Sequence, residues 1–424
     1  MKILSKKSFK NIILSLVFIY AAWIIIISLV NLFGVINRRN GEASSITGAN
    51  NQFAFDLFAR YKSNKNNVFF SPYSIVSAAG MVYEGARGKT ADEIQSAFGF
   101  PKDANKRLAD FSSINFDINK PDKKYTLSVA NALWGQKDYP FSQNYLDTIS
   151  TNYGGNATNL DFVSDTEGSR QTINNWVADK TNQKIQNLFP QGSIGSETRL
   201  VLTNAIYFKG KWQTPFDKKD TEDKSFVPGW GLIRKTSTMI DKGSEYKYGE
   251  DLTSQIIELP YASHELSMYV VLPRNGIFYP LNGFWFDNSF NLQKFESLKS
   301  SMNYEKVDVY LPKFKFETEY ELNNALSKMG MSTVFSPNAD FSGTSEKKGL
   351  FINEALHKAY IDVDEEGTEA AAATGFGMMT MGIGGPHFAP PPKIFRADHP
   401  FMFVIVHNVT GTILFLGKVN NPAE

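Results

Sequence analysis

The sequence predicts one α+β domain that follows an apolar N-terminal segment. Apolar residues recur at helical spacing over 53–59, 71–98 and 171–188, so helices dominate the first half of the chain. Strand-like runs dominate the second half, and this order favours α+β over alternating βαβ units. After about Gly48, neither a low-complexity linker nor a repeat of roughly 20–50 residues divides the chain. We therefore expect a single mixed domain over 48–424.

Composition excludes several classes of function. The 424 residues carry 44 Lys and Arg against 43 Asp and Glu, and this near-neutral balance gives no support to nucleic-acid binding. Cysteine is absent, which excludes disulfides, a thiol nucleophile and Cys-ligated zinc. The five histidines form no HExxH motif and no GxSxG motif occurs, so we expect no metal, no cofactor and no enzymatic activity.

The segment 12–36 is almost unbroken in its apolar character, and only Ser15, Ser28, Asn31 and Gly34 interrupt it. A helix needs about 20 apolar residues to cross a bilayer, so this segment predicts a transmembrane signal-anchor. The alternative is a cleaved secretory signal, whose apolar region has roughly 7–15 residues and ends in a small-residue site, and in that case the domain would be secreted.

Positive charge sets the expected orientation of this anchor. Four lysines precede the span and two arginines follow it, so we expect residues 1–11 in the cytoplasm, a linker over 37–47 and the domain on the extracytoplasmic side. The flanking residues are Lys2, Lys6, Lys7, Lys10, Arg38 and Arg39.

Local signals place the helices. Ser71 and Pro72 predict a helix start, and 85–88 interrupts the helical pattern. The residues 88–90 (GKT) resemble the end of a phosphate-binding loop, but Tyr83 stands where that motif requires glycine. We therefore expect a new helix with its N-cap at Thr90 and Glu93 three residues later. Pro190 is expected to stop the helix over 171–188.

Strands are predicted wherever apolar and β-branched residues gather in short runs. These runs are 200–208, 255–259, 266–272, 307–316, 359–363, 401–407 and 412–419.

The segment 364–386 is unusual because it is long, rich in Ala and Gly, and uncharged after Glu369. Long loops in compact domains tend to be functional. Written as a strand, it carries small residues first and bulky apolar residues later, with no charge on the face of Thr368. Gly367 would supply a hinge before it. Such a segment suits a strand that enters an existing sheet, although the pattern alone is equally compatible with an irregular surface loop.

Four motifs in the same order along the chain resemble those of the serpin family of serine protease inhibitors. They are VFFSPYSI at 68–75, TNAIYFKGKW at 203–212, EEGTEAAAA at 365–373, and HPFMF at 399–403 followed by FLGKVNNP at 415–422. The resemblance covers about 51–424. It implies three β-sheets, about nine helices and an exposed reactive-centre loop that inserts into the largest sheet after a protease cuts it.

The resemblance also implies site residues. Ser71, Ser74, Asn204 and His357 match a buried polar cluster where the sheet opens, although His357 alone is compatible with an ordinary core histidine. Lys313 and Glu365 match an ion pair near Trp212 at the top of the sheet, and two solvated charges are the alternative. The hinge corresponds to Glu365, Glu366, Gly367, Thr368, Glu369, Ala370, Ala371, Ala372 and Ala373.

Family spacing places the scissile bond between Met381 and Gly382, with Met378 and Met379 as rival sites. The stretch 382–389 is longer than the family pattern, so Phe388 is a further candidate. Methionine before the cut predicts an elastase-, chymotrypsin- or subtilisin-like serine protease as partner, or a related cysteine protease. A monomer is expected. The alternative is a non-inhibitory serpin that acts as a binding protein or chaperone. The aromatic segment 277–286 is a second departure from the family pattern. It could belong to the core, to an interface or to a lipid-facing surface.

Overall fold

The computed structural model describes residues 42–63, 65–120, 124–229, 232–274, 290–345, 349–368 and 390–423. The predicted anchor over 12–36, the aromatic segment 277–286, the hinge from Glu369 onward and the proposed Met381–Gly382 bond lie outside these residues. Within the described ranges, no helix combines the length and apolar character needed to cross a membrane.

The helices gather in the first half of the chain, as the sequence predicts. They are α2 (Ile46–Tyr61), α3 (Pro72–Gly85), α4 (Gly88–Phe98), α5 (Ala104–Asn119), α6 (Gln143–Tyr153), α7 (Thr166–Lys180), α9 (Leu292–Ser300) and α10 (Leu322–Lys328), with 3-10 turns η1 (Lys218–Asp220) and η2 (Thr333–Phe335).

The described residues form two hydrogen-bonded sheets, and the larger one has nine strands. Its order is β1 (Val68–Phe70), β15 (Thr412–Val419), β14 (Phe401–His407), β8 (Leu266–Pro273), β7 (Ser254–Pro260), β6 (Arg234–Glu250), β9 (Asn303–Pro312) and β13 (Lys393–Arg396), with β5 (Glu222–Phe226) paired to β6.

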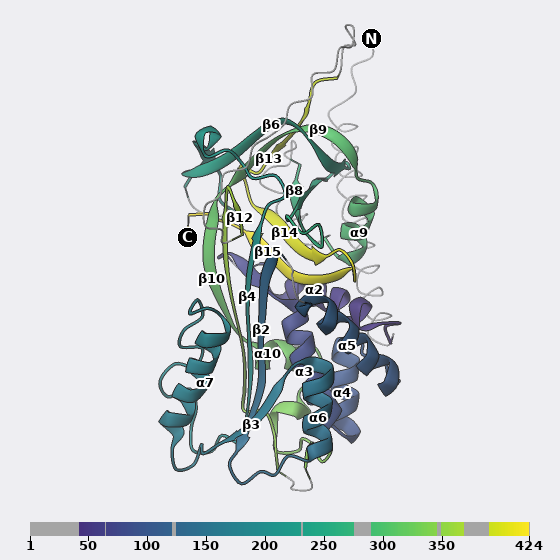
Figure 1. The fold of residues 1–424 in the computed structure, drawn as a ribbon, viewed down its shortest axis with the longest axis vertical. Helices are drawn as coiled ribbons and strands as arrows, with labels where there is room; N and C mark the ends of the chain where they lie inside the picture. The colour runs from purple at the N-terminus through teal and green to yellow at the C-terminus, as the bar shows by residue number, and fades with distance from the viewer. Residues whose placement is uncertain are drawn as a thin grey trace, which may run out of the picture.

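The second sheet has six strands in the order β10 (Phe314–Glu321), β11 (Glu354–Asp364), β12 (Gly367–Thr368), β4 (Leu200–Lys211), β2 (Tyr125–Gln136) and β3 (Asn156–Leu160). In Figure 1 the long strands β10, β4 and β2 run down the molecule, with α7 on one side and α3 to α6 on the other.

Hydrogen bonding gives two sheets within the described residues, whereas three were expected. The difference comes from β6, which is 17 residues long and pairs with β5, β7 and β9. Its register against β9 shifts between Asp241 and Ser244, where Gly243 has a φ of 70°. The strand bends there without losing its ladder, so two expected sheets are joined through one strand.

The side chains of β4 alternate between the two faces of the six-stranded sheet, and this explains how the sheet is buried on both faces. Val201 and Ala205 belong to a cluster that includes residues of α7, whereas Leu202 and Ile206 belong to the main core with α3. Successive side chains of a strand point to opposite faces, so one strand serves both layers.

Several helix and strand boundaries differ from the sequence prediction. The helix predicted over 53–59 extends from Ile46 to Tyr61, and its start at the fully buried Ile46 lies within the predicted linker 37–47. The helix predicted over 171–188 begins at Thr166 and ends at Lys180, because Asn182 and Gln183 adopt positive φ angles of 51° and 62°. The predicted strand 307–316 divides at Lys313 into β9 and β10, which belong to different sheets.

The predicted N-cap at Thr90 is wrong. The helix α4 begins at Gly88, and the Thr90 hydroxyl accepts a hydrogen bond from the Asp340 amide at 2.9 Å. Glu93 accepts hydrogen bonds from the amide and hydroxyl of Thr333. Both side chains therefore bind the distant η2 region instead of capping their own helix. Ser71, in contrast, does cap α3 by accepting from the Ser74 amide at 3.1 Å.

Candidate functional site

The six-stranded sheet is closed in its lower half and parted in its upper half. Strands β4 and β11 pair directly, in parallel, from Val201 and Glu354 up to Ile206 and Ala359. Above this stretch β12 lies between them, with Thr368 opposite Gly210 on one side and Val363 on the other. Figure 1 shows β12 near the upper ends of β10 and β4. The first residues of the Ala-rich segment therefore already form a short strand within the sheet.

Gly367 is required at the entrance of this short strand. Its φ is 152°, and a Cβ atom built on it would lie 2.1 Å from the carbonyl oxygen of Gly210. Any side chain would therefore collide with the backbone of β4. The sequence indicated a flexible hinge at this position, and the structure adds close backbone contact as a second reason for glycine.

Thr368 faces the core behind the sheet. It is 1% exposed, and its hydroxyl lies 2.7 Å from the Tyr261 hydroxyl. Burial raises the pKa of Tyr261 far above its usual value, so this phenol stays protonated. A small polar side chain is accommodated here, whereas a large or charged one is not.

Trp212 holds the turn that joins β11 to β12. Its backbone N–H donates to the Glu366 carbonyl at 2.9 Å, and its indole N–H donates to the Asp364 carbonyl at 2.9 Å. Its ring stacks on Tyr261 with the centroids 4.7 Å apart. The turn and the Thr368 contact therefore share one aromatic support.

Glu365 lies at the top of the sheet beside Lys313. Its side-chain oxygens lie 3.0 Å from the Lys313 ammonium and 2.8 Å from the Thr221 hydroxyl, which donates to it. Burial alone would raise the pKa of Glu365, but hydrogen bonds from the backbone, Lys313 and Thr221 outweigh it and leave that pKa below its usual value. The structure thus brings Lys313, Glu365 and Trp212 to the same turn, and Glu365 is a buried carboxylate with partners.

The polar cluster lies where the sheet is still closed. Asn131, Asn204 and His357 stand in one row across β2, β4 and β11, because Asn204 is opposite both of the others. The N-terminus of α3 contributes Ser71 and Ser74 to the same cluster. The four residues expected from the sequence are therefore in contact.

Most polar atoms of the cluster have hydrogen-bond partners. Asn204 Nδ2 donates to Ser74 Oγ and to Asn131 Oδ1, both at 2.8 Å, and Ser74 Oγ donates to Asn131 Oδ1 at 3.1 Å. The Ser71 amide donates to His357 Nε2 at 3.0 Å, and His357 Nδ1 contacts Asn204 Oδ1. Buried polar groups need such partners, so the row acts as one unit.

His357 is neutral in this setting. It is fully buried, and burial lowers its pKa to about 3. Because Nε2 accepts the Ser71 amide, the ring proton belongs on Nδ1, which donates to Asn204. Entry of a strand between β4 and β11 at this level would break that His357–Asn204 contact.

Sequence reasoning missed four residues of the site: Asn131, Thr221, Tyr261 and Tyr320. Asn131 and Tyr320 extend the polar row to β2 and β10, and the Tyr320 hydroxyl accepts from the Phe69 amide at 3.2 Å. An Asn within the apolar alternation of 125–136 was a usable signal for Asn131. Thr221 and Tyr261 reach the hinge only through tertiary packing.

Within the described part of the chain, no group of three or more potential ligands is arranged to hold a metal ion. What the described residues do form at this site is a partly opened sheet and the polar row that closes the rest of it.

Comparisons with known proteins agree with this architecture. The profile of the family described as Serpin (serine protease inhibitor) matches residues 48–422. A protein named uncharacterized serpin-like protein, from Methanosarcina acetivorans, is 42% identical over 387 residues, which cover 90% of this chain and 87% of that protein. Human leukocyte elastase inhibitor is 39% identical over 393 residues, covering 89% of this chain and 99% of the inhibitor.

Solved structures are similar over the same region. Uncleaved ovalbumin matches with a TM-score of 0.78 and 31% identity, over 89% of this chain and 100% of ovalbumin. Human thyroxine-binding globulin complexed with thyroxine matches with a TM-score of 0.79 and 30% identity, over 89% of this chain and 99% of that chain.

Proposed function

Because this chain belongs to the serpin family, we propose that it inhibits serine proteases as a suicide substrate. In the proposed reaction, the protease serine attacks the carbonyl carbon of Met381. The bond to the Gly382 nitrogen breaks, and the chain up to Met381 stays attached to the protease as an acyl-enzyme. The freed segment then extends β12 between β4 and β11 and carries the protease with it. The serpin's own residues perform no catalysis.

The parted sheet is the observation that carries this proposal. Gly367 and Thr368 already pair with both neighbouring strands, so insertion needs only to continue a ladder that has begun. Insertion adds hydrogen bonds to both strands and buries apolar side chains, which supplies the driving force. Strand addition and serpin loop insertion are general examples of this physics.

The register of β12 predicts what insertion would meet. Six residues beyond Thr368, the same ladder reaches Asn204 in β4 and His357 in β11 at once. The residue that would arrive there is Thr374, a hydroxyl within an otherwise small and apolar run. A hydroxyl can replace the hydrogen bond lost between Asn204 and His357, so insertion would not leave those buried groups unpaired.

Protease class is proposed from the residue before the cut. Met381 fits a medium-sized apolar pocket, which favours elastase-, chymotrypsin- or subtilisin-like enzymes. The likeness to human leukocyte elastase inhibitor supports an elastase-like target. Met378, Met379 and Phe388 would direct the chain to proteases of similar preference.

We also propose that residues 12–36 anchor the chain in a membrane, with the serpin domain on the extracytoplasmic side. The length of this apolar segment and the lysines before it support the proposal. Retention in the membrane pellet after alkaline carbonate extraction, with the domain accessible to added protease only from outside, tests it. Release of the domain by carbonate would contradict it.

The direct test of inhibition uses the full-length chain with an elastase-like and a chymotrypsin-like protease. A denaturing gel should show a covalent adduct of chain and protease, and sequencing of the released C-terminal fragment locates the cut. Cleavage of the loop with no adduct would contradict inhibition and favour the alternative of a non-inhibitory binding serpin.

A further inference from the structure

One side of the domain lies next to the point where the N-terminal segment joins it. Glu42, the first described residue, accepts a hydrogen bond from the Lys102 amide at 2.8 Å. The Ala43 amide donates to the Gly99 carbonyl at 3.0 Å. Gly99 and Lys102 both lie in the connection between α4 and α5. The chain therefore enters the domain at the N-terminal end of α5.

The proposed membrane anchor ends shortly before this point. Five residues, 37–41, separate the anchor from Glu42, and five fully extended residues span at most about 18 Å. A compact domain of this length is about 50 Å across. This step rests on the anchor proposed above: if residues 12–36 cross a bilayer, the N-terminal end of α5 lies closer to its surface than half the width of the domain.

The outer face of α5 carries an exposed aromatic residue. Phe111 and Ile114 lie on the buried side of this helix. Exposed residues recur every three or four positions on the other side, so they form one stripe along the helix. Phe116 belongs to it and is 71% exposed. The stripe consists of Lys106, Ala109, Ser113 and Phe116.

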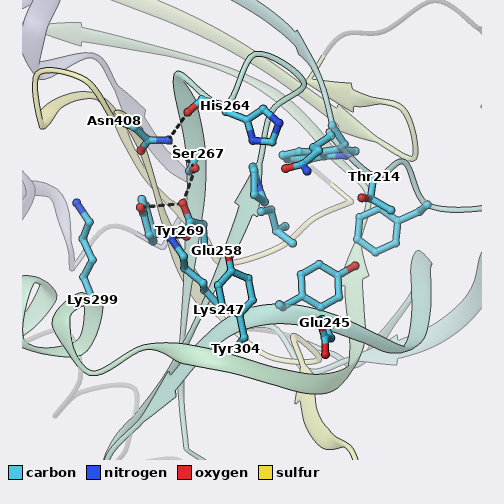
Figure 2. Close-up of a pocket in the computed structure, with 16 residues that line it drawn as sticks. Thr214, Glu245, Lys247, Glu258, His264, Ser267, Tyr269, Lys299, Tyr304 and Asn408 are labelled. Atoms are coloured by element: carbon cyan, nitrogen blue, oxygen red, sulfur yellow. Dashed lines mark hydrogen bonds and ion pairs between the residues drawn. The ribbon is translucent and has the colours of Figure 1, made fainter. Parts of the chain in front are cut away.

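Contacts at the C-terminal end of α5 continue this side of the molecule to the turn between β14 and β15. Lys120, the C-cap residue of α5, forms an ion pair with Glu265 in the turn between β7 and β8. The Glu265 carbonyl accepts a hydrogen bond from the Asn408 amide at 2.7 Å. Figure 2 shows that the Asn408 side chain also binds His264 of the same turn. The residue after Asn408 is Val409, which is 61% exposed.

The start of α2 lies between these two elements. The Ile46 amide donates to Asp110 Oδ2 of α5 at 2.9 Å. The Thr47 hydroxyl lies 3.2 Å from the Thr412 hydroxyl at the start of β15. The chain that follows the linker therefore contacts both α5 and the β14–β15 hairpin, the two elements that carry Phe116 and Val409.

The charges of α5 and its two ends do not favour a strongly charged partner. Arg107 is buried and paired with Glu84, and the other charges balance. Single exposed apolar residues are common on proteins, so what distinguishes Phe116 and Val409 is their position beside the linker. A neutral side with apolar projections suits the interfacial region of a bilayer. The balancing charges are Lys102, Lys106 and Lys120 against Asp103, Asp110 and Asp117.

We propose that the outer face of α5 and the β14–β15 turn rest on the bilayer that holds the anchor, with Phe116 and Val409 in its interfacial region. Bulky apolar side chains gain free energy when they leave water for this region. The anchor also gives the domain a high effective concentration at the surface, so a contact too weak to bind a free domain is sufficient to orient a tethered one. In Figure 1 α5 lies on the side of the molecule away from β12, so this orientation leaves the hinge accessible to a protease.

Fluorescence quenching in vesicles tests this orientation. The chain contains no cysteine, so Ser113→Cys and Asn175→Cys each accept one environment-sensitive NBD label. Ser113 belongs to the stripe of α5, whereas Asn175 is an exposed residue of α7, on the other face of the six-stranded sheet. The labelled full-length chain is reconstituted in phosphatidylcholine vesicles and isolated by flotation. Its emission is then compared with and without nitroxide-labelled lipid.

We expect nitroxide lipid to quench the label at Ser113 at least about three times as strongly as the label at Asn175. Phe116→Ser in the Ser113→Cys chain should reduce that quenching by at least about twofold. Val163→Ser is the matched control, because Val163 is 51% exposed in the turn before α7, and it should leave the quenching unchanged.

The outcomes distinguish the anchor from the orientation. Failure of the full-length chain to float with the vesicles would overturn the anchor, and the orientation with it. Flotation with equal quenching at Ser113 and Asn175 would leave the anchor standing and overturn the orientation. A shifted emission at Ser113 without quenching by nitroxide lipid would identify a second copy of the chain as the occupant of this side and would also overturn the orientation.

Discussion

The lower and upper halves of the six-stranded sheet differ in what lies between β4 and β11. Below, the two strands pair directly, and the row containing Asn204 and His357 crosses the seam. Above, β12 separates them, and contacts of Trp212 and Glu365 hold the turn that feeds it. The upper half therefore already holds a short strand between β4 and β11, and the lower half holds the polar row that a longer strand would have to replace under the proposed mechanism.

This difference separates two kinds of residue. Residues of the upper half are expected to decide whether the segment can enter the sheet, so their substitution should change the outcome of the protease reaction. Residues of the lower half are expected to decide how firmly the native sheet stays shut, so their substitution should change the stability of the uncleaved chain.

The largest effect is expected for Thr368→Arg. Thr368 is 1% exposed and bonded to Tyr261, and a buried unpaired guanidinium would block entry of the strand. The chain should then be cut as an ordinary substrate, and the fraction of protease captured as covalent adduct should fall by at least about tenfold. Quantitative denaturing gels measure this fraction.

Glu369→Arg is the matched control for that prediction. In an inserted strand Glu369 would face away from Thr368, and it is already charged, so a charge there should be tolerated. Normal adduct formation by Thr368→Arg, or equal loss in both variants, would contradict the assignment of Thr368 to the buried face.

The next largest effect is expected for His357→Leu in the lower half. The change leaves the Ser71 amide and Asn204 Oδ1 without their partner, which costs about 1–3 kcal/mol of the free energy of unfolding. Urea unfolding of the uncleaved chain measures it. The exposed His264→Asn serves as control, because Asn tolerates the positive φ of 57° at this position, and an equal midpoint for the two variants would show that the polar row does not stabilise the closed sheet.

A smaller effect is expected for Lys313→Met in the upper half. The substitution removes the cation that pairs with the buried Glu365. Because the Lys313 side chain is 38% exposed, solvent screening limits the loss in the free energy of unfolding to about 1 kcal/mol at neutral pH. The pKa of Glu365 is lower in the folded state than in the unfolded chain. The stability that the ionised carboxylate contributes is therefore complete above the unfolded pKa of about 4.3, and it is lost as pH falls through the pKa of the folded state. Wild type and variant should therefore converge in stability on acidification, and a constant difference from pH 7 to acidic pH would contradict this.

The smallest effect is expected for Glu354→Gln at the lower end of β11. Burial, followed by Glu321 and Glu319, raises the pKa of Glu354 to about 7. The stability that protonated Glu354 contributes is complete below about pH 4.3 and is lost as pH rises to about 7. The melting temperature of the variant should therefore exceed that of the wild type by about 1–2 °C at alkaline pH and equal it at acidic pH. A lower melting temperature of the variant at alkaline pH would show that the Glu354 carboxylate is stabilising.

Much of this architecture could be predicted from the sequence because local signals were strong. Ser71 and Pro72 carry both an N-cap and a fixed φ, so the start of α3 was readable. The apolar runs that became β7, β8, β14 and β15 are buried along most of their length, which makes them recognisable without tertiary information.

The remaining features depended on contacts distant in sequence. Thr90 and Glu93 matched a capping box, yet their partners are Asp340 and Thr333, far along the chain. The sharing of β6 between expected sheets depends on a register shift that no local pattern encodes. Tyr261 stacks on Trp212 and contacts Thr368, which lies 107 residues further along the chain, so the hinge contact was beyond sequence reasoning.

The central claim is that the nicked loop extends β12 down the seam between β4 and β11. Thermal unfolding of the full-length chain before and after cleavage of the reactive loop tests it most directly. The account predicts a melting temperature at least about 20 °C higher after cleavage, because the inserted strand adds a full ladder and buries its apolar face. An unchanged or lower melting temperature in a chain shown to be cut within 369–389 would contradict the account.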